Sequence, residues 1–326
     1  PEAVAPRLAA AFTAATTLPF GPVHLTFPMD IQRAPAPSTA PPITKSPNHQ
    51  ITQSPRLPAA HRPLLIAGGG VFYAGAGEAL ERFCNECAVP VVVPIWDRGA
   101  IDRPIPQFMG VIGAATGGPR LLADADLVLL CGARADYRVG YGDSRFVAIA
   151  PAHLDTLRLD PRPEWLAEAQ RRRDEFRHAF ERAAVRRPGG IHALDIVAAL
   201  RAVLTDETIL LIDGGSIGQW IHQLLCDRYP SRWLTCGPSG VVGWGLPGAM
   251  AARLCFPDRP VILVSGDGAM TFTIAELECA ARQNLPFVAI VADDQAWGIT
   301  RTGHQRQFGE PISSQLGPID FAALAE

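Results

Sequence analysis

This sequence has no long apolar run, and its one basic run, Arg171-Arg172-Arg173, is more typical of a solvated helix face. No apolar run reaches the roughly 18 residues that a membrane-spanning helix needs, and no signal peptide is recognisable. No basic cluster is interleaved with aromatic residues, and the formal net charge is −3. Membrane and nucleic acid are therefore not expected partners. We expect a cytoplasmic protein that acts on a small molecule.

The sequence also lacks the cysteine pattern of a disulfide framework or a zinc site. Seven cysteines are an odd number, and they are spread over a long chain. Cys84 and Cys87 form a CxxC, but they lie in a helical pattern from residue 77 to 88. No second CxxC or histidine pair completes a four-ligand set. We predict that both are core thiols.

What the sequence does contain is a regular alternation of short apolar strands with helical patterns. Hydrophobic residues make up 48% of the 326 residues, enough for two cores. This alternation predicts the α/β class, with two doubly wound parallel-sheet domains. Expected strands cover residues 64–67, 89–94, 125–131 and 156–160 in the first domain, and 208–213, 233–236, 261–265 and 287–292 in the second.

The predicted domain order includes the tail of a third domain. Residues 1–31 resemble the last helix and strand of a domain, and 32–61 form a linker rich in Pro, Ser and Thr. Residues 62–164 form the central domain, 165–189 a connecting helix, and 190–326 the last domain. The first residue is Pro1, and a helical pattern begins only at residue 320. These ends lead us to expect a piece of a longer chain.

Acidic residues follow two consecutive strands of the second domain. Gly266-Asp267-Gly268 ends one strand, and Asp293-Asp294 ends the next. One crossover helix separates them, so the two strand ends should be neighbours in a parallel sheet. Asp267 and Asp294 would then share one hard cation, and Mg²⁺ prefers such oxygen ligands together with phosphate oxygens. Either acidic pair alone is more typical of a turn or a helix cap.

These residues resemble the cofactor motif of thiamine diphosphate-dependent enzymes, in which GDG is followed after one crossover by NN. The match is to the acetolactate synthase-like group, which includes benzaldehyde lyase and oxalyl-CoA decarboxylase relatives. The resemblance covers nearly the whole chain. It implies a thiamine diphosphate- and Mg²⁺-dependent lyase or carboligase acting on 2-oxo acids. It also implies a homodimer or homotetramer, because the cofactor of this family lies between two subunits.

The resemblance implies a role for particular positions. Mg²⁺ would be held by Asp267, Asp294 and the Ala296 carbonyl, and Gly268 and Ala269 would offer N–H groups to the diphosphate. The Gly240 carbonyl would accept a hydrogen bond from the aminopyrimidine, and Val242 would be the apolar wedge that bends the cofactor. The remaining expected cofactor contacts are Ser216, Gly266, Trp297 and Gly298.

No catalytic residue is expected in this sequence. The family activates its cofactor with a glutamate of the pyrimidine-binding domain, of which only the end is matched. Glu276 and Glu278 lie on the crossover helix, where they should face solvent or another subunit. Without that glutamate, the chain by itself should be inactive.

Two departures from the family pattern bear on function. Asp293-Asp294 replaces NN, which adds negative charge beside a diphosphate. Gly303 occupies the position of a tryptophan in a downstream pattern like MVRQWQ of acetolactate synthases. His304 beside it is more typical of a solvated loop than of a substrate contact. A lyase of the 2-hydroxyacyl-CoA, oxalyl-CoA or benzaldehyde type is therefore an alternative, as is a non-catalytic structural homologue.

A nucleotide in the central domain is the remaining alternative. Arg138 matches an arginine that contacts FAD in some relatives, and Asp160 lies near the expected nucleotide edge. Many relatives keep this domain without a nucleotide, so FAD or ADP stays open. Gly68-Gly69-Gly70 alone is weak evidence for a dehydrogenase, because Glu86, at the spacing of a ribose-binding acid, lies inside a helical pattern.

Overall fold

The computed structural model describes residues 4–17, 23–25, 57–183, 185 and 189–326. The chain forms two compact units, residues 1–53 and 54–326. In the first unit, the predicted N-terminal helix is α1 (Val4–Thr16). The strand expected near residues 21–28 lies largely outside the described residues, and residues 23–25 form no strand. Nearly all of the predicted linker also lies outside them.

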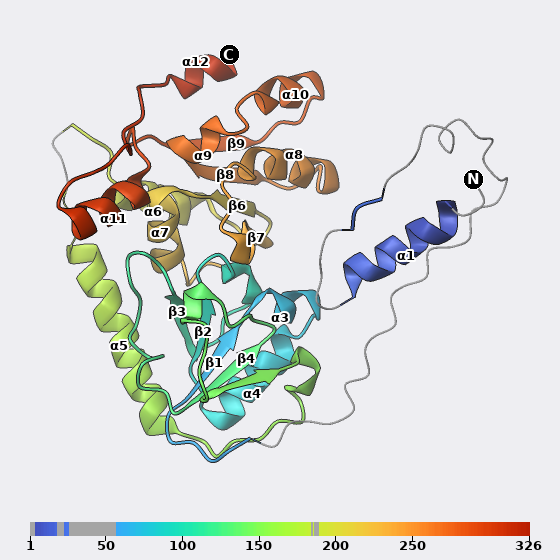
Figure 1. Cartoon of the computed structure of the whole chain (residues 1–326), viewed down its shortest axis with the longest axis vertical. Helices are drawn as coiled ribbons and strands as arrows, with labels where there is room; N and C mark the ends of the chain where they lie inside the picture. Colours follow the sequence, from blue (N-terminus) through green and yellow to red (C-terminus); the bar gives the residue numbers. More distant parts are fainter. Residues whose placement is uncertain (1–3, 18–22, 26–56, 184, 186–188) are drawn as a thin grey trace. The chain divides into compact units, whose positions relative to one another are not determined.

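A five-stranded parallel sheet forms the first half of the second unit (Figure 1). Its order is β3-β2-β1-β4-β5, and every neighbouring pair is parallel. The strands are β1 (Pro63–Ala67), β2 (Val91–Pro94), β3 (Phe108–Ile112), β4 (Leu127–Cys131) and β5 (Phe146–Ile149). Helices α3 (Gly69–Tyr73) and α4 (Gly77–Cys87) contribute to the core on one face, and α5 (Pro163–Arg182) covers the other. This confirms the predicted doubly wound parallel sheet.

The strand predicted at residues 156–160 is wrong, and β3 and β5 were not predicted. Alternating apolar residues there resemble a strand, but Leu154 and Leu157 enter the core from a turn after a short 3-10 helix, η3 (Pro151–His153). Both β3 and β5 are edge strands, and β5 is only partly buried and therefore lacks the continuous apolar signal of the central strands.

A second parallel sheet has the order β7-β6-β8-β9. Its strands are β6 (Ile209–Asp213), β7 (Arg232–Thr235), β8 (Val261–Gly266) and β9 (Val288–Ala292). Helices α6 (Ala193–Val203) and α7 (Gly215–Leu224) pack on one face, and α8 (Gly245–Cys255) packs on the other (Figure 1). The fold class predicted from the sequence is confirmed for both sheets.

Two local predictions in the second sheet need correction. The single helix expected over residues 271–283 is two helices, α9 (Asp267–Thr271) and α10 (Glu276–Arg282). Between them, the Thr273 hydroxyl donates to the Gly243 carbonyl at 2.8 Å, where the chain leaves the helical path. The segment around His304, expected as a loop, is helix α11 (Gly298–Phe308), and α12 (Phe321–Ala325) follows.

The two sheets are joined by a buried arginine. Arg98, in the 3-10 helix η1 (Arg98–Ala100), is 1% exposed. Its guanidinium donates to the carbonyls of Ile101, Cys226 and Arg228 at 2.6–2.9 Å. The rings of Phe108, Tyr229 and Trp233 surround it at 4.9–5.1 Å. Because these contacts come from both sheets, the cation–π and hydrogen-bond contacts of one residue stabilise their packing.

Cys84 and Cys87 are buried, unpaired core residues of α4, as predicted. Burial raises the pKa of the Cys84 thiol above its ordinary value. None of the described helices has both the length and the apolar character to span a membrane.

Candidate functional site

The candidate site lies at the carboxyl ends of β6, β8 and β9. After β7 the chain crosses to the other side of β6 to form β8, so β6 and β8 flank the topological switch point of the second sheet. The carboxyl end of β6 pairs with β8, Asp213 opposite Ser265, and the end of β8 pairs with β9, Gly266 opposite Ala292. This is the crevice in which open α/β sheets bind ligands. The predicted proximity of the strand ends that carry Asp267 and Asp294 is confirmed.

Asp267 is held tightly at the end of β8. Its side chain accepts hydrogen bonds from the N–H of Gly268 at 2.8 Å and of Ala296 at 3.1 Å, and the residue is 4% exposed. Burial raises the pKa of the Asp267 carboxyl above its ordinary value, the negative charge of Asp294 adds to the rise, and the two N–H groups oppose it. Two carboxylates that repel each other in this way are suited to share a cation.

Asp294 has a partner that the sequence analysis did not identify. Its Oδ2 lies 2.9 Å from Nη2 of Arg301, in the first turn of α11. Burial raises the pKa of Asp294, and the charge of Arg301 works against that rise. Arg301 therefore offsets part of the charge that Asp294 adds in place of the usual asparagine.

The Asp294 carboxylate and the Ser216 hydroxyl both lie close to Gly298, the first residue of α11. A Cβ added to Gly298 would lie 2.6 Å from the Asp294 Oδ2 and would also collide with the Ser216 hydroxyl. Only glycine leaves room for both oxygen atoms at this point. The predicted contacts Ser216 and Gly298 thus lie together beside the predicted metal ligand.

These donors fit Mg²⁺. Among the described residues, no three His, Cys, Asp or Glu side chains gather as a metal-binding cluster. The predicted set has only two carboxylates, from Asp267 and Asp294, and takes its third protein ligand from the Ala296 main chain. Hard oxygen donors with room for phosphate and water are what Mg²⁺ requires, rather than a complete cage of side chains.

Asp213 holds the glycine-rich loop that is predicted to contact the aminopyrimidine. Its two carboxylate oxygens accept from the N–H groups of Gly243 at 3.1 Å and Gly245 at 2.8 Å. Burial raises the pKa of Asp213, against the effect of these two bonds. This side chain therefore fixes the loop, a role that the sequence analysis did not assign. An acid followed by two glycines at a strand end was the available signal.

The predicted wedge, Val242, is packed against the strand ends. A Cβ added to Gly214 would lie 2.9 Å from Val242 Cγ1 and 3.1 Å from Ala269 Cβ. Gly214 has φ 58°, which also favours glycine. The three residues form one contact that brings Val242 beside the predicted diphosphate position.

The structure changes the prediction for Gly268. Its N–H, expected to be offered to a diphosphate, donates to its own neighbour Asp267 at 2.8 Å. A Cβ at Gly268 would lie 2.9 Å from ring carbons of Trp297, so the indole packs directly on this glycine. Trp297 also meets Phe272 edge to face, with ring centroids 5.7 Å apart. Its observed role is to cover the β8 turn.

The other acidic and basic candidates lie apart from the site. Glu276 and Glu278 are exposed on α10, and Glu278 pairs with Arg282, as expected for a solvent-facing helix. The ring of His304, on α11, contacts the backbone of Ile312, which follows that helix. Gly303 has open space around it.

The segment expected to contact a nucleotide is used internally. The Arg138 side chain is 1% exposed and is paired with Asp136 and Asp97 at 2.8 and 3.2 Å. Its guanidinium points into the protein and not toward a nucleotide. Asp160 is exposed, lies outside any strand, and faces Arg162 at 3.7 Å. The strand predicted before it does not form, and a nucleotide edge at Asp160 stays a prediction.

Gly68 and Gly70 allow close packing of two chain segments. A Cβ at Gly70 would lie 2.7 Å from the α-carbon of Gly132, and Gly70 donates its N–H to the Gly132 carbonyl at 3.0 Å. A Cβ at Gly68 would likewise lie 2.5 Å from the Ala133 α-carbon. These contacts hold the chain after β1 against the chain after β4. Glu86 lies within α4, as expected.

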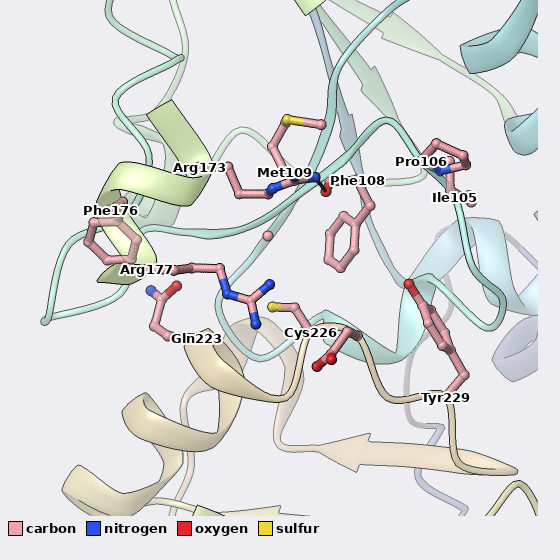
Figure 2. A pocket seen from close by; sticks show the side chains of 12 residues that line it. Ile105, Pro106, Phe108, Met109, Arg173, Phe176, Arg177, Gln223, Cys226 and Tyr229 are labelled. Atoms are coloured by element: carbon pink, nitrogen blue, oxygen red, sulfur yellow. Dashed lines mark hydrogen bonds between the residues drawn. The ribbon is translucent and has the colours of Figure 1, made fainter. Parts of the chain in front are cut away.

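A separate cavity of about 140 Å³ lies between α5, α7 and the chain before β3 (Figure 2). Phe176 and Arg177 face it from α5, and Gln223 lines it from α7. None of the residues predicted to bind the cofactor or metal lines this cavity. Its lining therefore gives no support for the predicted site, which rests on the strand ends.

Two family models match the chain. Residues 55–174 match the central domain of thiamine pyrophosphate enzymes, and residues 213–326 match the C-terminal TPP binding domain. The second match begins at Asp213 and contains both acidic strand ends. Together the two matches cover the first sheet and the strands β7, β8 and β9 of the second.

Two of the similar proteins are acetolactate synthase large subunits. The acetolactate synthase large subunit IlvG of Mycobacterium tuberculosis is 26% identical over 80% of this chain and 52% of its own length. The acetolactate synthase isozyme 2 large subunit of Escherichia coli is 27% identical over 98% of this chain and 65% of its own length. The chain thus spans about half to two thirds of the length of these relatives.

A solved structure shares the fold. It belongs to a protein described as a thiamin diphosphate-dependent enzyme isolated from Mycobacterium smegmatis. The TM-score is 0.71 over 99% of this chain and 67% of the other, with 20% sequence identity.

Proposed function

We propose that this chain is part of a C–C bond lyase or carboligase that acts on 2-oxo acids. It carries the central domain and the C-terminal cofactor-binding domain of the thiamine pyrophosphate enzymes and so belongs to that family. Thiamine diphosphate and Mg²⁺ are the proposed cofactors. The observation that carries the proposal is the pair of carboxylates, Asp267 and Asp294, at neighbouring strand ends. The names of the acetolactate synthase relatives support the substrate class.

The residues of this chain would bind and orient the cofactor. Asp267, Asp294 and the Ala296 carbonyl would hold Mg²⁺ against the diphosphate. Gly240 and Val242 would bind and bend the aminopyrimidine end, on a loop that Asp213 already fixes. When bound, thiamine diphosphate supplies an electron sink for breaking or forming a bond beside a carbonyl carbon. We assign no residue of this sequence as the proton-moving glutamate.

The extra negative charge of Asp294 does not favour a non-catalytic homologue. The main support for a non-catalytic homologue was that an aspartate at this position repels a diphosphate. The ion pair of Asp294 with Arg301 at 2.9 Å offsets that charge. Asp294 would keep an oxygen atom free for a metal, since Arg301 contacts only one of its two carboxylate oxygens.

A lyase of the 2-hydroxyacyl-CoA, oxalyl-CoA or benzaldehyde type stays the second candidate. It is favoured by Gly303, which presents no side chain where acetolactate synthases carry tryptophan, and which has no neighbour within 4 Å. Gly303 lies on an open face of α11, where it provides no side chain for contact with a substrate. A substrate other than that of acetolactate synthases is therefore the second candidate to test.

We also propose that the protein forms a homodimer or homotetramer in the cytoplasm. Large apolar side chains are exposed beside the candidate site, among them Val241 and Phe272. Exposed apolar groups beside a ligand site are typical of a surface covered by another subunit. Light scattering of the purified protein, with and without thiamine diphosphate, measures this state.

Product analysis tests the proposed activity. The full-length protein, meaning the longer chain of which this sequence is expected to be a piece, is incubated with thiamine diphosphate, Mg²⁺ and pyruvate. Oxalyl-CoA and benzoin replace pyruvate in separate reactions. We expect carbon dioxide and acetolactate from pyruvate. Cleavage of benzoin or oxalyl-CoA instead selects the second candidate. Cofactor binding without turnover of any of these would contradict the proposed activity, and absence of cofactor binding would contradict the cofactor assignment as well.

A further inference from the structure

Two turns that follow strands of the first sheet lie near the loop of residues 237–245, which is predicted to bind the aminopyrimidine. One turn precedes and includes η1 (Arg98–Ala100), and the other includes η2 (Tyr137–Val139). Asp97 is the N-cap residue of the first turn, and Asp136 is that of the second.

Arg138 ties these two turns together. Its Nη2 lies 2.8 Å from Asp136 Oδ2, and its Nη1 lies 3.2 Å from Asp97 Oδ2. Nη1 also donates to the Ile95 carbonyl at 2.8 Å, and Nε donates to Asp136 at 3.0 Å. All three nitrogens of the guanidinium are therefore engaged by the chain itself. A buried ion pair contributes little net stability but fixes geometry strongly, because breaking it leaves a buried charge unpaired.

The first turn contacts the start of the loop. The Trp96 carbonyl accepts a hydrogen bond from the Thr235 hydroxyl, at the end of β7. Gly99 packs directly on the Trp233 carbonyl, leaving no room for a side chain. β7 leads through Cys236 into η4 (Gly237–Ser239) and Gly240. The position at which the loop begins is thereby set by the turn that Arg138 holds.

The second turn contacts the loop itself. The Tyr137 hydroxyl lies 3.3 Å from the position of a Cβ on Gly240, which has φ 62°. Tyr137 is 51% exposed. Its hydroxyl lies next to the loop residue whose carbonyl is predicted to accept a hydrogen bond from the aminopyrimidine.

We propose that Arg138 and Tyr137 are positioning residues for the loop of residues 237–245. Arg138 fixes the two turns, and Tyr137 transmits that position to Gly240. This inference rests on the proposed function, because the ligand of the loop is the aminopyrimidine of thiamine diphosphate. It gives the buried arginine a role in cofactor affinity in place of a nucleotide contact.

The composition of the loop explains why it needs support. Gly237, Gly240, Gly243 and Gly245 lie within nine residues, and glycine loses more conformational freedom on ordering than any other residue. Asp213 fixes only the far end, at Gly243 and Gly245. Support at Gly240 reduces the ordering that remains when a ligand binds, and so increases affinity.

Amide hydrogen exchange of the ligand-free full-length protein tests the positioning role without any cofactor. Variants Tyr137→Ala and Arg138→Met are compared with Tyr141→Ala and Arg145→Met. Tyr141 is 73% exposed, and Arg145 pairs with Asp143 two residues earlier, as Arg138 pairs with Asp136. We expect exchange of the Gly240 and Val241 amides to rise at least about tenfold in the first two variants only. Equal exchange in Tyr137→Ala and Tyr141→Ala would overturn the proposal.

Cofactor titration supplies the second readout. In folded Tyr137→Ala, we expect the half-saturating concentration of thiamine diphosphate to rise at least fivefold, and excess cofactor to restore turnover. Unchanged cofactor affinity in this variant overturns the proposal, and if Arg138→Met does not fold, Tyr137→Ala decides alone. Failure of the unmodified protein to bind thiamine diphosphate contradicts the proposed function instead, and the exchange experiment still judges the positioning of the loop.

Discussion

The carboxylate of Asp267 accepts a hydrogen bond from the N–H of Ala296 at 3.1 Å. This bond ties the turn after β8 to the loop after β9, the two segments that carry the predicted metal ligands. The loop that follows β9 is therefore positioned by one metal ligand before any metal is present. Both segments depend on one buried side chain.

Replacing Asp267 with asparagine should weaken metal-dependent cofactor binding. The amide keeps an oxygen acceptor but removes the negative charge that attracts Mg²⁺. We expect the Kd for Mg²⁺, measured by calorimetry at fixed thiamine diphosphate, to rise at least about tenfold. The control is Asp258→Asn, at an exposed position after α8. Equal affinity in the two variants would contradict the assignment of Asp267 as a ligand.

Removing Arg301 should expose the extra charge of Asp294. The pair is partly exposed, so the stability of Arg301→Gln should change by less than about 1 kcal/mol. Affinity for Mg²⁺–thiamine diphosphate should fall severalfold, because Asp294 then repels the diphosphate without compensation. Adding Asp294→Asn in the same chain should recover that loss. A double variant no better than Arg301→Gln alone would show that charge compensation is not the role of this arginine.

Two glycine-to-alanine changes should have effects of opposite sign. At Gly268 the new methyl group would lie 2.9 Å from the Trp297 ring, so we expect a loss of about 1–3 kcal/mol from overpacking. At Gly303 nothing lies within 4 Å on helix α11, and alanine should stabilise by up to about 1 kcal/mol. Denaturant unfolding of both variants measures this. A neutral result for Gly268→Ala would mean that the indole moves freely from this position.

His222 should make the protein sensitive to acid. The ring is fully buried between Trp96 and Trp233, and no described residue bonds to either nitrogen. Burial, and then the charge of Arg98, lower its pKa to about 3. The folded state therefore binds fewer protons than the unfolded state between about pH 6.5 and 3. Stability from this residue is complete above pH 6.5 and is lost as pH falls through that window.

The expected loss is up to about 1.4 kcal/mol per pH unit below pH 6.5. Denaturant unfolding at pH 7.5 and pH 5 should show a smaller pH dependence for His222→Leu than for the unmodified protein. His178→Gln, at an exposed position of α5, should keep the full dependence. Identical pH dependence in His222→Leu and the unmodified protein would contradict this account.

The sequence predicts the strand ends of the site well, because continuous apolar runs mark buried parallel strands such as β6 and β8. The acids that follow them are then placed by the topology. The ion-pair partner of Asp294 was not predicted, because it lies on an element that the sequence analysis did not identify as a helix. Arg301 lies in the first turn of α11 and pairs with Asp294 in the loop before it, but the polar sequence of α11 has no apolar periodicity and was interpreted as a loop.

Tertiary pairing explains the other differences. Arg138 matches a nucleotide contact by position, yet its direction is decided by Asp97, which lies 41 positions earlier and joins it only in the folded chain. The edge strand β5 is half-buried and gives a weak apolar signal. No local pattern near Arg138 or β5 contains this information.

Calorimetric titration of the full-length protein with thiamine diphosphate, with and without Mg²⁺, tests the central claim most directly. The two acidic strand ends at Asp267 and Asp294 predict binding that requires Mg²⁺ and is abolished by a chelator. Binding of equal strength without Mg²⁺, or no binding in its presence, would contradict the assignment of these carboxylates as the metal site of a thiamine diphosphate cofactor.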